Sequence, residues 1–362
     1  MTTARSQLIC PEVTPYYHCV SRCVRRSFLC GKDVVTGKSY EHRRAWVEQR
    51  MLALASVYCI RICSYAIMSN HYHLVAFIDK EAALSLSDLE VVERWCSEHQ
   101  PPVIIQRWLA NQISSKAESH TCSQLIKTWR HRLFSLSWFM RELNYDIAVQ
   151  ANKEDQCTGR FWEGRFKSQA LLDEKALLSA MAYVDLNPIR AKMADSPEQS
   201  DHTSIQARLG SLERGETTTP SLANFLGHEH QDKHHGIPFR LVDYIELIDW
   251  VGRQIREDKR GHIDNRLPVI LKRLSLSQQE CLTLCSELEK KPRAWVGSTI
   301  ELEKVKTQLG KKTNGGITDF ITNTIDKPVK LNPSFPKLSS NKHLYTSQTT
   351  SSILLIAISI PE

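Results

Sequence analysis

Several features that would place this 362-residue chain in a familiar class are missing from its sequence. No Cys-x-x-Cys pair occurs among the eleven cysteines, so the tight pairs typical of structural zinc sites are absent. No P-loop glycine pattern is present, and the apolar run at 353–360 is too short to span a bilayer. The odd, scattered cysteines and the lack of an apolar leader-like segment predict reduced thiols in a cytoplasmic protein.

The composition that is present is typical of a globular protein. Hydrophobic residues make up 41% of the chain and charged residues 24%, which argues against wholesale disorder. The 47 basic and 40 acidic residues give a formal net charge of +7. Arg22, Arg25 and Arg26 follow an aromatic run near the N-terminus. This excess favours a polyanionic partner, with a solvated basic surface as the alternative.

Hydrophobic periodicity predicts the order of the elements up to residue 195. Alternating or β-branched and aromatic stretches predict four strands, at 16–24, 57–68, 71–78 and 160–172. Helical spacing predicts helices at 41–54, 125–151 and 174–193, with a mixed helical stretch at 82–127 that Pro101 and Pro102 interrupt. This order predicts an α+β fold in which helices back an antiparallel sheet.

Beyond residue 195 the sequence becomes more polar. Helical segments are expected at 240–257 and 267–290, and we expect 196–309 to form a helical extension of unknown role. Periodicity fades after Gly310, so 310–362 is expected to be a flexible tail. Four histidines cluster in a polar, glycine-flanked stretch, and we interpret them mainly as a solvated loop, with metal binding as the minor alternative. They are His228, His230, His234 and His235.

The strongest local signal is the pair His71 and His73 at the start of a predicted strand. Residues two apart on a strand point to the same face, so both imidazoles can approach one metal ion. Two surface histidines on an edge strand are the alternative, because this spacing is common.

A second signal is Tyr183, followed four residues later by Asn187. On one continuous helix the two side chains project from the same face. Tyr183 is interpreted either as a nucleophile or as a half-buried packing residue. Asn187 before Pro188 is also a good helix start, so its role could be that of a cap.

Four ordered motifs resemble the single-tyrosine HUH transposases, in particular the REP-associated tyrosine transposases. They are YHCVSR at 17–22, AIMSNHYHLV at 66–75, GRFWEGRFKS at 159–168 and YVDLNPIRA at 183–191. The resemblance covers 12–195 and implies a ferredoxin-like HUH catalytic domain at 1–195. Two departures are Ser69, where the family usually has proline, and a long separation of His73 from Tyr183, which we assign to an insertion near 84–124.

The resemblance implies a DNA transposase that cleaves and rejoins single-stranded DNA through a covalent 5′-phosphotyrosine. It makes Tyr183 the nucleophile and gives His71, His73 and Asn187 as ligands of a divalent metal, Mg²⁺ or Mn²⁺. The expected partner is single-stranded, hairpin-forming DNA, a homodimer is an open alternative, and no membrane is expected. The residues expected to contact DNA are Arg22, Arg160, Arg165, Lys167 and Trp162.

Two other functions stay open at this point. One is a catalytically lapsed, host-retained nucleic-acid-binding protein of the same fold. The other is a metal-dependent hydrolase of small phosphoesters, which would not need a tyrosine facing the metal and leaves the basic and aromatic strand unexplained.

Overall fold

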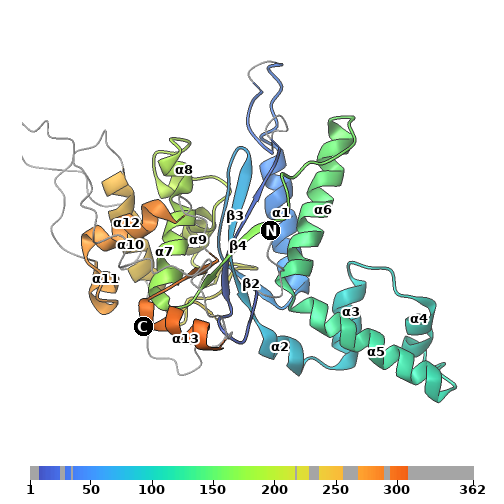
Figure 1. The fold of residues 1–362 in the computed structure, drawn as a ribbon. Helices are drawn as coiled ribbons and strands as arrows, with labels where there is room; N and C mark the ends of the chain where they lie inside the picture. Colours follow the sequence, from blue (N-terminus) through green and yellow to red (C-terminus); the bar gives the residue numbers. More distant parts are fainter. Residues whose placement is uncertain are drawn as a thin grey trace, which may run out of the picture.

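The computed structural model describes residues 8–24, 29–33, 36–216, 218–227, 236–255, 268–288 and 294–308. A five-stranded sheet with the order β2-β3-β1-β4-β5 lies at its centre (Figure 1). The strands are β1 (Tyr16–Arg22), β2 (Ile60–Ile67), β3 (His71–Ile78), β4 (Lys167–Leu171) and β5 (Trp295–Val296). The first four pair antiparallel, and β5 joins β4 in parallel. The predicted α+β fold with an antiparallel, helix-backed sheet is confirmed.

Helices cover both faces of this sheet. The helices are α1 (Arg43–Val57), α2 (Lys80–Ser85), α3 (Asp88–Cys96), α4 (Val103–Leu109), α5 (Lys116–Leu133), α6 (Leu136–Glu154), α7 (Glu174–Asp185), α8 (Asn187–Arg190), α9 (Ser204–Glu213), α10 (Leu241–Ile255), α11 (Val269–Arg273), α12 (Gln278–Glu287) and α13 (Thr299–Gln308). In Figure 1, α1 and α6 lie on one side of the sheet, and α7, α10 and α12 lie on the other. The helices α3, α4 and α5 project away from the sheet below α6.

Side-chain alternation along β3 divides the core into two clusters. Tyr72 and Leu74 point toward α1 and α6 and belong to the cluster that fills that side. Val75 and Phe77 point the other way and pack with α7 and α10. Because His73 lies two residues before Val75, its imidazole projects toward α7.

Three predicted elements begin or end at other residues in the structure. The helix predicted at 125–151 is two helices, because the carbonyl of Leu133 accepts a hydrogen bond from the Cys59 amide (2.8 Å) where the chain turns. The strand predicted at 160–172 begins only at Lys167, since the preceding segment makes one isolated bridge and then bends. The helix predicted at 174–193 ends at Asp185 and resumes at Asn187.

Residues on both sides of the predicted domain boundary at residue 195 belong to one hydrophobic cluster. The cluster on the α7 side contains Val184 together with Tyr244 and Leu247 of α10. The described residues of the stretch 196–309 contain α9 to α13 and also supply β5. The division into two parts and the insertion near 84–124 stay predictions.

Several expected features lie outside the described residues. They are the tail at 310–362 with its apolar run, the histidines at 228–235, and Arg25 and Arg26. Within the part of the chain that the structure describes, none of the helices combines the length and the apolar character needed to cross a bilayer.

Candidate active site

The two predicted metal-binding histidines lie side by side on an interior strand. Their ring centroids are 4.8 Å apart, and β3 is flanked by β2 and β1. His73 is fully buried, whereas His71 is partly exposed and bonds through Nδ1 to Asn70 Oδ1 (2.6 Å). The alternative of two surface histidines on an edge strand is therefore wrong.

Tyr183 lies on the same side of the sheet as these histidines. Its helix, α7, packs on β2, β3 and β4, and the ring centroid of Tyr183 is 5.6 Å from that of His73. The two rings meet edge to face at 74°. Only 7% of the Tyr183 surface is exposed. Sheet and helix thus bring the predicted nucleophile and both predicted imidazole ligands together.

A third histidine, His18 of β1, joins this group. Its Nε2 lies 3.0 Å from Nδ1 of His73, and its Nδ1 lies 2.7 Å from Oε1 of Gln169. The sequence places His18 inside one of the family-like motifs but does not reveal this contact. The alternation of Tyr16, His18 and Val20 indicates only that these side chains share one face of the strand. The register of β1 on β3 is what brings His18 to His73.

These contacts fix the protonation pattern of the histidine pair. Gln169 donates through Nε2 to the Leu288 carbonyl (3.3 Å), so its Oε1 faces His18 and accepts a hydrogen bond from the His18 Nδ1–H. The Nε2 of His18 must then accept, and His73 donates through Nδ1. Nε2 of His73 consequently carries the lone pair, which is the tautomer that binds a metal cation.

The pKa of His73 supports this neutral form. Burial lowers it well below its ordinary value, because a charged imidazole would lose its hydration. The neighbouring His18 and His71, and the charges of Arg190 and Arg22, lower it further. His73 is therefore neutral at neutral pH, as a metal ligand must be.

Arg190 lies over the ring of Tyr183. Its guanidinium carbon lies 4.0 Å from the centre of the Tyr183 ring, within the range of a cation–π contact. The same guanidinium donates to the carbonyls of Tyr183 and Cys285. Tyr183 and Arg190 lie on either side of the break between α7 and α8, so helical spacing alone does not predict this contact. Arg190 thus places a fixed positive charge beside the tyrosine.

Asn187 lies on α8, after a break in the helix. Pro188 has no amide hydrogen to continue the helical ladder, and α7 ends at Asp185. Leu186 caps α8, so Asn187 is its first residue and not its cap. The Asn187 side chain is 9% exposed, and its Nδ2 has no hydrogen-bond partner among the described residues. A buried amide in this state is costly unless something else satisfies it.

The predicted DNA contacts divide into two groups. Arg22, Arg160, Arg165 and Lys167 are exposed, and Arg22 pairs across the strands with His71. Trp162 is 9% exposed. Its indole N–H donates to the Asn144 carbonyl (2.7 Å), which leaves little of its ring for a base. The exposed basic side chains thus lie at the end of the sheet where His71 opens to solvent.

The side chains of the candidate site offer some of the ligands that a divalent cation needs. Among the described residues, no three side chains of histidine, cysteine, aspartate or glutamate form a group that could hold a metal ion. The two adjacent imidazoles can bind a cation, whereas the Asn187 atom without a partner among the described residues is Nδ2, an N–H donor that a cation cannot use. Asn187 would have to bind the cation through its amide oxygen Oδ1. Two imidazoles with one amide suit a transition cation such as Mn²⁺.

Comparison with known proteins gives one distant likeness. No protein-family model matches the chain, and no curated protein matches it. Among solved structures, the chain is similar to a REP-associated tyrosine transposase bound to a REP hairpin, with 10% sequence identity and a TM-score of 0.33. The alignment covers 65% of this chain and 97% of that chain. A likeness this weak carries no functional argument, so the function has to be argued from the side chains.

Proposed function

We propose that the protein is a transposase-type enzyme that cleaves and rejoins single-stranded DNA through a covalent bond to Tyr183. One observation carries this proposal. The Tyr183 ring contacts both the imidazole of His73 and the guanidinium of Arg190, on the sheet face that also holds His71. A purely structural tyrosine does not require two imidazoles and a guanidinium around it.

The proposed chemistry is transesterification. The Tyr183 oxygen bonds to phosphorus, the 3′ oxygen leaves and takes up a proton, and a 5′-phosphotyrosine remains. Since the phosphodiester energy stays in the new bond, a free 3′-hydroxyl can reverse the step and join strands without a nucleotide cofactor. Arg190 would stabilise negative charge that develops on the phosphate oxygens.

His71, His73 and Asn187 are the residues that would hold a divalent cation, Mg²⁺ or Mn²⁺. When bound, the cation would neutralise the non-bridging phosphate oxygens and orient the scissile bond. The hydrogen bond from His73 to His18 would keep the His73 ring in the orientation that ligation needs.

The proposed substrate is a DNA hairpin with single-stranded flanks. Arg22, Arg160, Arg165 and Lys167 would bind its phosphates, because they are exposed and lie at the open end of the site. Trp162 stays a proposed contact only through the edge of its ring that remains exposed.

The test is to trap the covalent adduct. Incubation with labelled hairpin DNA and Mn²⁺ or Mg²⁺, followed by denaturing electrophoresis, should give a protein–DNA band that Tyr183→Phe lacks. Tyr58→Phe is the matched control, since the Tyr58 hydroxyl is buried without a hydrogen-bond partner among the described residues. An adduct that persists in Tyr183→Phe would assign the nucleophile to another side chain.

A second function is favoured by one observation. Tyr183 and Asn187 are 7% and 9% exposed, and His73 is fully buried, so a phosphate reaches them only if covering side chains move. Such burial is expected of a DNA-binding protein that no longer catalyses strand cleavage. Such a protein would bind the hairpin and form no adduct with any metal, which separates it from the first proposal.

A further inference from the structure

The outer face of α6 carries basic and aromatic side chains one helical turn apart. Arg141, Tyr145, Val149 and Lys153 repeat at every fourth residue and are all exposed. Tyr145 is 64% exposed and Val149 is 49% exposed. Successive members of this row are ~6 Å apart along the axis, given the rise of an α-helix. The ring of Tyr145 is thus accessible to a partner.

The first two acidic residues of α6 are engaged by basic partners from neighbouring helices. Glu142 lies 3.8 Å from Nε2 of His99, and Asp146 accepts from Nε of Arg50 at 2.6 Å. Arg50 belongs to α1, which packs beside α6. Each of these carboxylates therefore has a partner beside the exposed row, and Arg50 also pairs with Glu98.

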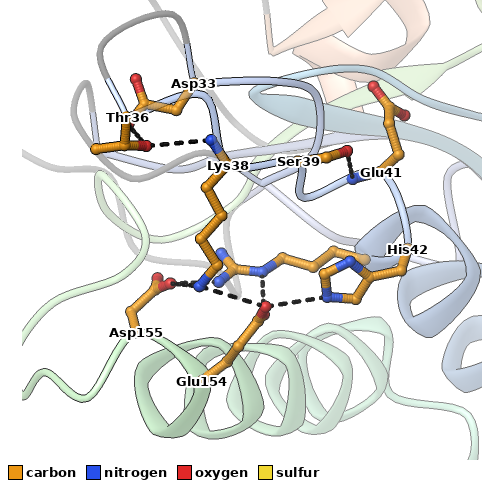
Figure 2. Close-up of polar contacts among 9 residues, drawn as sticks. Asp33, Thr36, Lys38, Ser39, Glu41, His42, Glu154 and Asp155 are labelled. Carbon is orange, nitrogen blue, oxygen red and sulfur yellow. Dashed lines mark hydrogen bonds and ion pairs between the residues drawn. The ribbon is translucent and has the colours of Figure 1, made fainter.

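The remaining acidic residue, Glu154, is surrounded by basic side chains, as Figure 2 shows. Arg43, itself fully buried, donates to Glu154 (2.7 Å) and to Asp155 (2.5 Å). His42 and Lys38 approach Glu154 within 3.1 and 3.6 Å. The carboxylates at the C-terminal end of α6 are thus occupied, which leaves Arg141 and Lys153 to set the charge of the exposed row.

The row extends toward the N-terminal end of α6 through Trp138. This partly buried indole contacts two guanidinium groups, with Arg132 4.0 Å and Arg141 4.5 Å from its ring centre. Stacked guanidinium and indole groups offer flat surfaces with positive charge, the combination that unpaired bases and phosphates bind.

The row is also continuous with the exposed basic residues of the candidate active site. The Asn152 amide of α6 donates to the Gly159 carbonyl (3.1 Å), immediately before Arg160. Trp162 donates to the Asn144 carbonyl in the middle of α6. The segment that carries Arg160 and Arg165 therefore lies against α6.

We propose that the face of α6 from Trp138 to Lys153 binds a single-stranded extension of the DNA substrate. Tyr145 stacks on a base, and Arg141 and Lys153 bind the phosphates on either side. The inference deepens the proposed function, since it rests on the same DNA substrate, and it gives that substrate a path that leads away from Tyr183.

The test compares two oligonucleotides with the full chain: a hairpin with short flanks, and the same hairpin with a long oligothymidine extension at either end. Tyr145→Ala should weaken binding of the extended DNA by roughly 5- to 150-fold, the loss expected for one base stack. Binding of the short hairpin should not change. Tyr145→Phe keeps the ring and should bind both as the wild type does. Val242→Ala removes a side chain of similar exposure on α10, across the sheet, and is the control.

Photo-crosslinking adds a direct readout. A thymidine analogue in the extension should crosslink to α6 and give a peptide that contains Tyr145. Unchanged affinity of Tyr145→Ala for the extended DNA would overturn the proposal, as would equal losses in the phenylalanine and alanine variants. Equal weakening for the short hairpin would mean that the surface binds duplex, which also overturns it. Failure of Tyr183 to form an adduct would appear in a different assay and leaves these affinities interpretable.

Discussion

Nε2 of His18 lies 3.0 Å from Nδ1 of His73, and this hydrogen bond joins the first strand of the sheet to the third. Gln169 holds the other nitrogen of His18 from β4, so three strands fix one imidazole. A side chain that orients a ligand acts through that ligand and touches no substrate. In the proposed metal site, His18 and Gln169 would therefore act as positioning residues for His73.

The first prediction concerns this positioning. His18→Phe keeps a ring of similar size but removes the acceptor for His73, and we expect Mn²⁺ affinity to fall about 10- to 100-fold. Titration calorimetry of the full chain measures the affinity, and the melting temperature shows whether the fold is retained. His131→Phe, an exposed position on α5, is the control. Unchanged Mn²⁺ affinity in a folded His18→Phe protein would remove His18 from the site.

The second prediction concerns Arg190. Arg190→Lys keeps the charge but loses the planar fork that covers Tyr183 and donates to two carbonyls. We expect about 1–3 kcal/mol lower stability and slower adduct formation. Arg253→Lys replaces an exposed arginine paired with Asp249 and should change neither quantity. Normal adduct formation in Arg190→Lys would show that a positive charge at this position is enough for adduct formation and that the guanidinium geometry is not needed.

The third prediction concerns salt dependence. Arg160 and Arg165 are exposed and would each release about one counterion on binding DNA. Arg160→Ala and Arg165→Ala should each reduce the slope of log affinity against log salt by about one unit at most. Fluorescence anisotropy at several salt concentrations gives the slope, with Arg214→Ala as the exposed control. If both slopes match the wild type, these arginines do not contact phosphate.

The fourth prediction concerns pH and links α1 to the chain beyond residue 195. Glu48 accepts hydrogen bonds from His202 and from the Tyr65 hydroxyl, both at 2.7 Å. Burial raises the pKa of Glu48, but these two donors and the nearby charge of His202 outweigh it, so the pKa lies below its ordinary value. The resulting stability is present above about pH 4.5 and is lost as the pH falls through the folded-state pKa.

Glu48→Gln should therefore lower the free energy of unfolding at neutral pH by about 1–3 kcal/mol. The difference from the wild type should shrink below about pH 4.5, because both proteins then lack the charge. Urea unfolding at several pH values measures this, and Glu93→Gln on the exposed face of α3 is the control. A difference that stays constant with pH would mean that shape, and not charge, matters at this position.

Local sequence patterns predicted much of the fold. The pattern at 71–78 predicts a strand with the observed limits, because β-branched and aromatic residues are bounded by a Ser-Asn turn. The patterns at 125–151 and 174–193 each predict a single helix, since Phe134 and Leu186 fit a helical pattern. A hydrogen bond from Cys59 and the ring of Pro188 end them. The two-residue strand β5 is too short to leave any periodicity.

The sequence by itself determined which side chains of β3 share a face, because strand geometry makes His71 and His73 point the same way. Only the tertiary structure decided that Tyr183 faces them, that His18 orients His73, and that Arg190 covers the tyrosine. It also decided that Trp162 is buried while Tyr145 is exposed. The reason is physical: a local pattern fixes the direction of a side chain, whereas strand register and helix packing fix what that side chain meets.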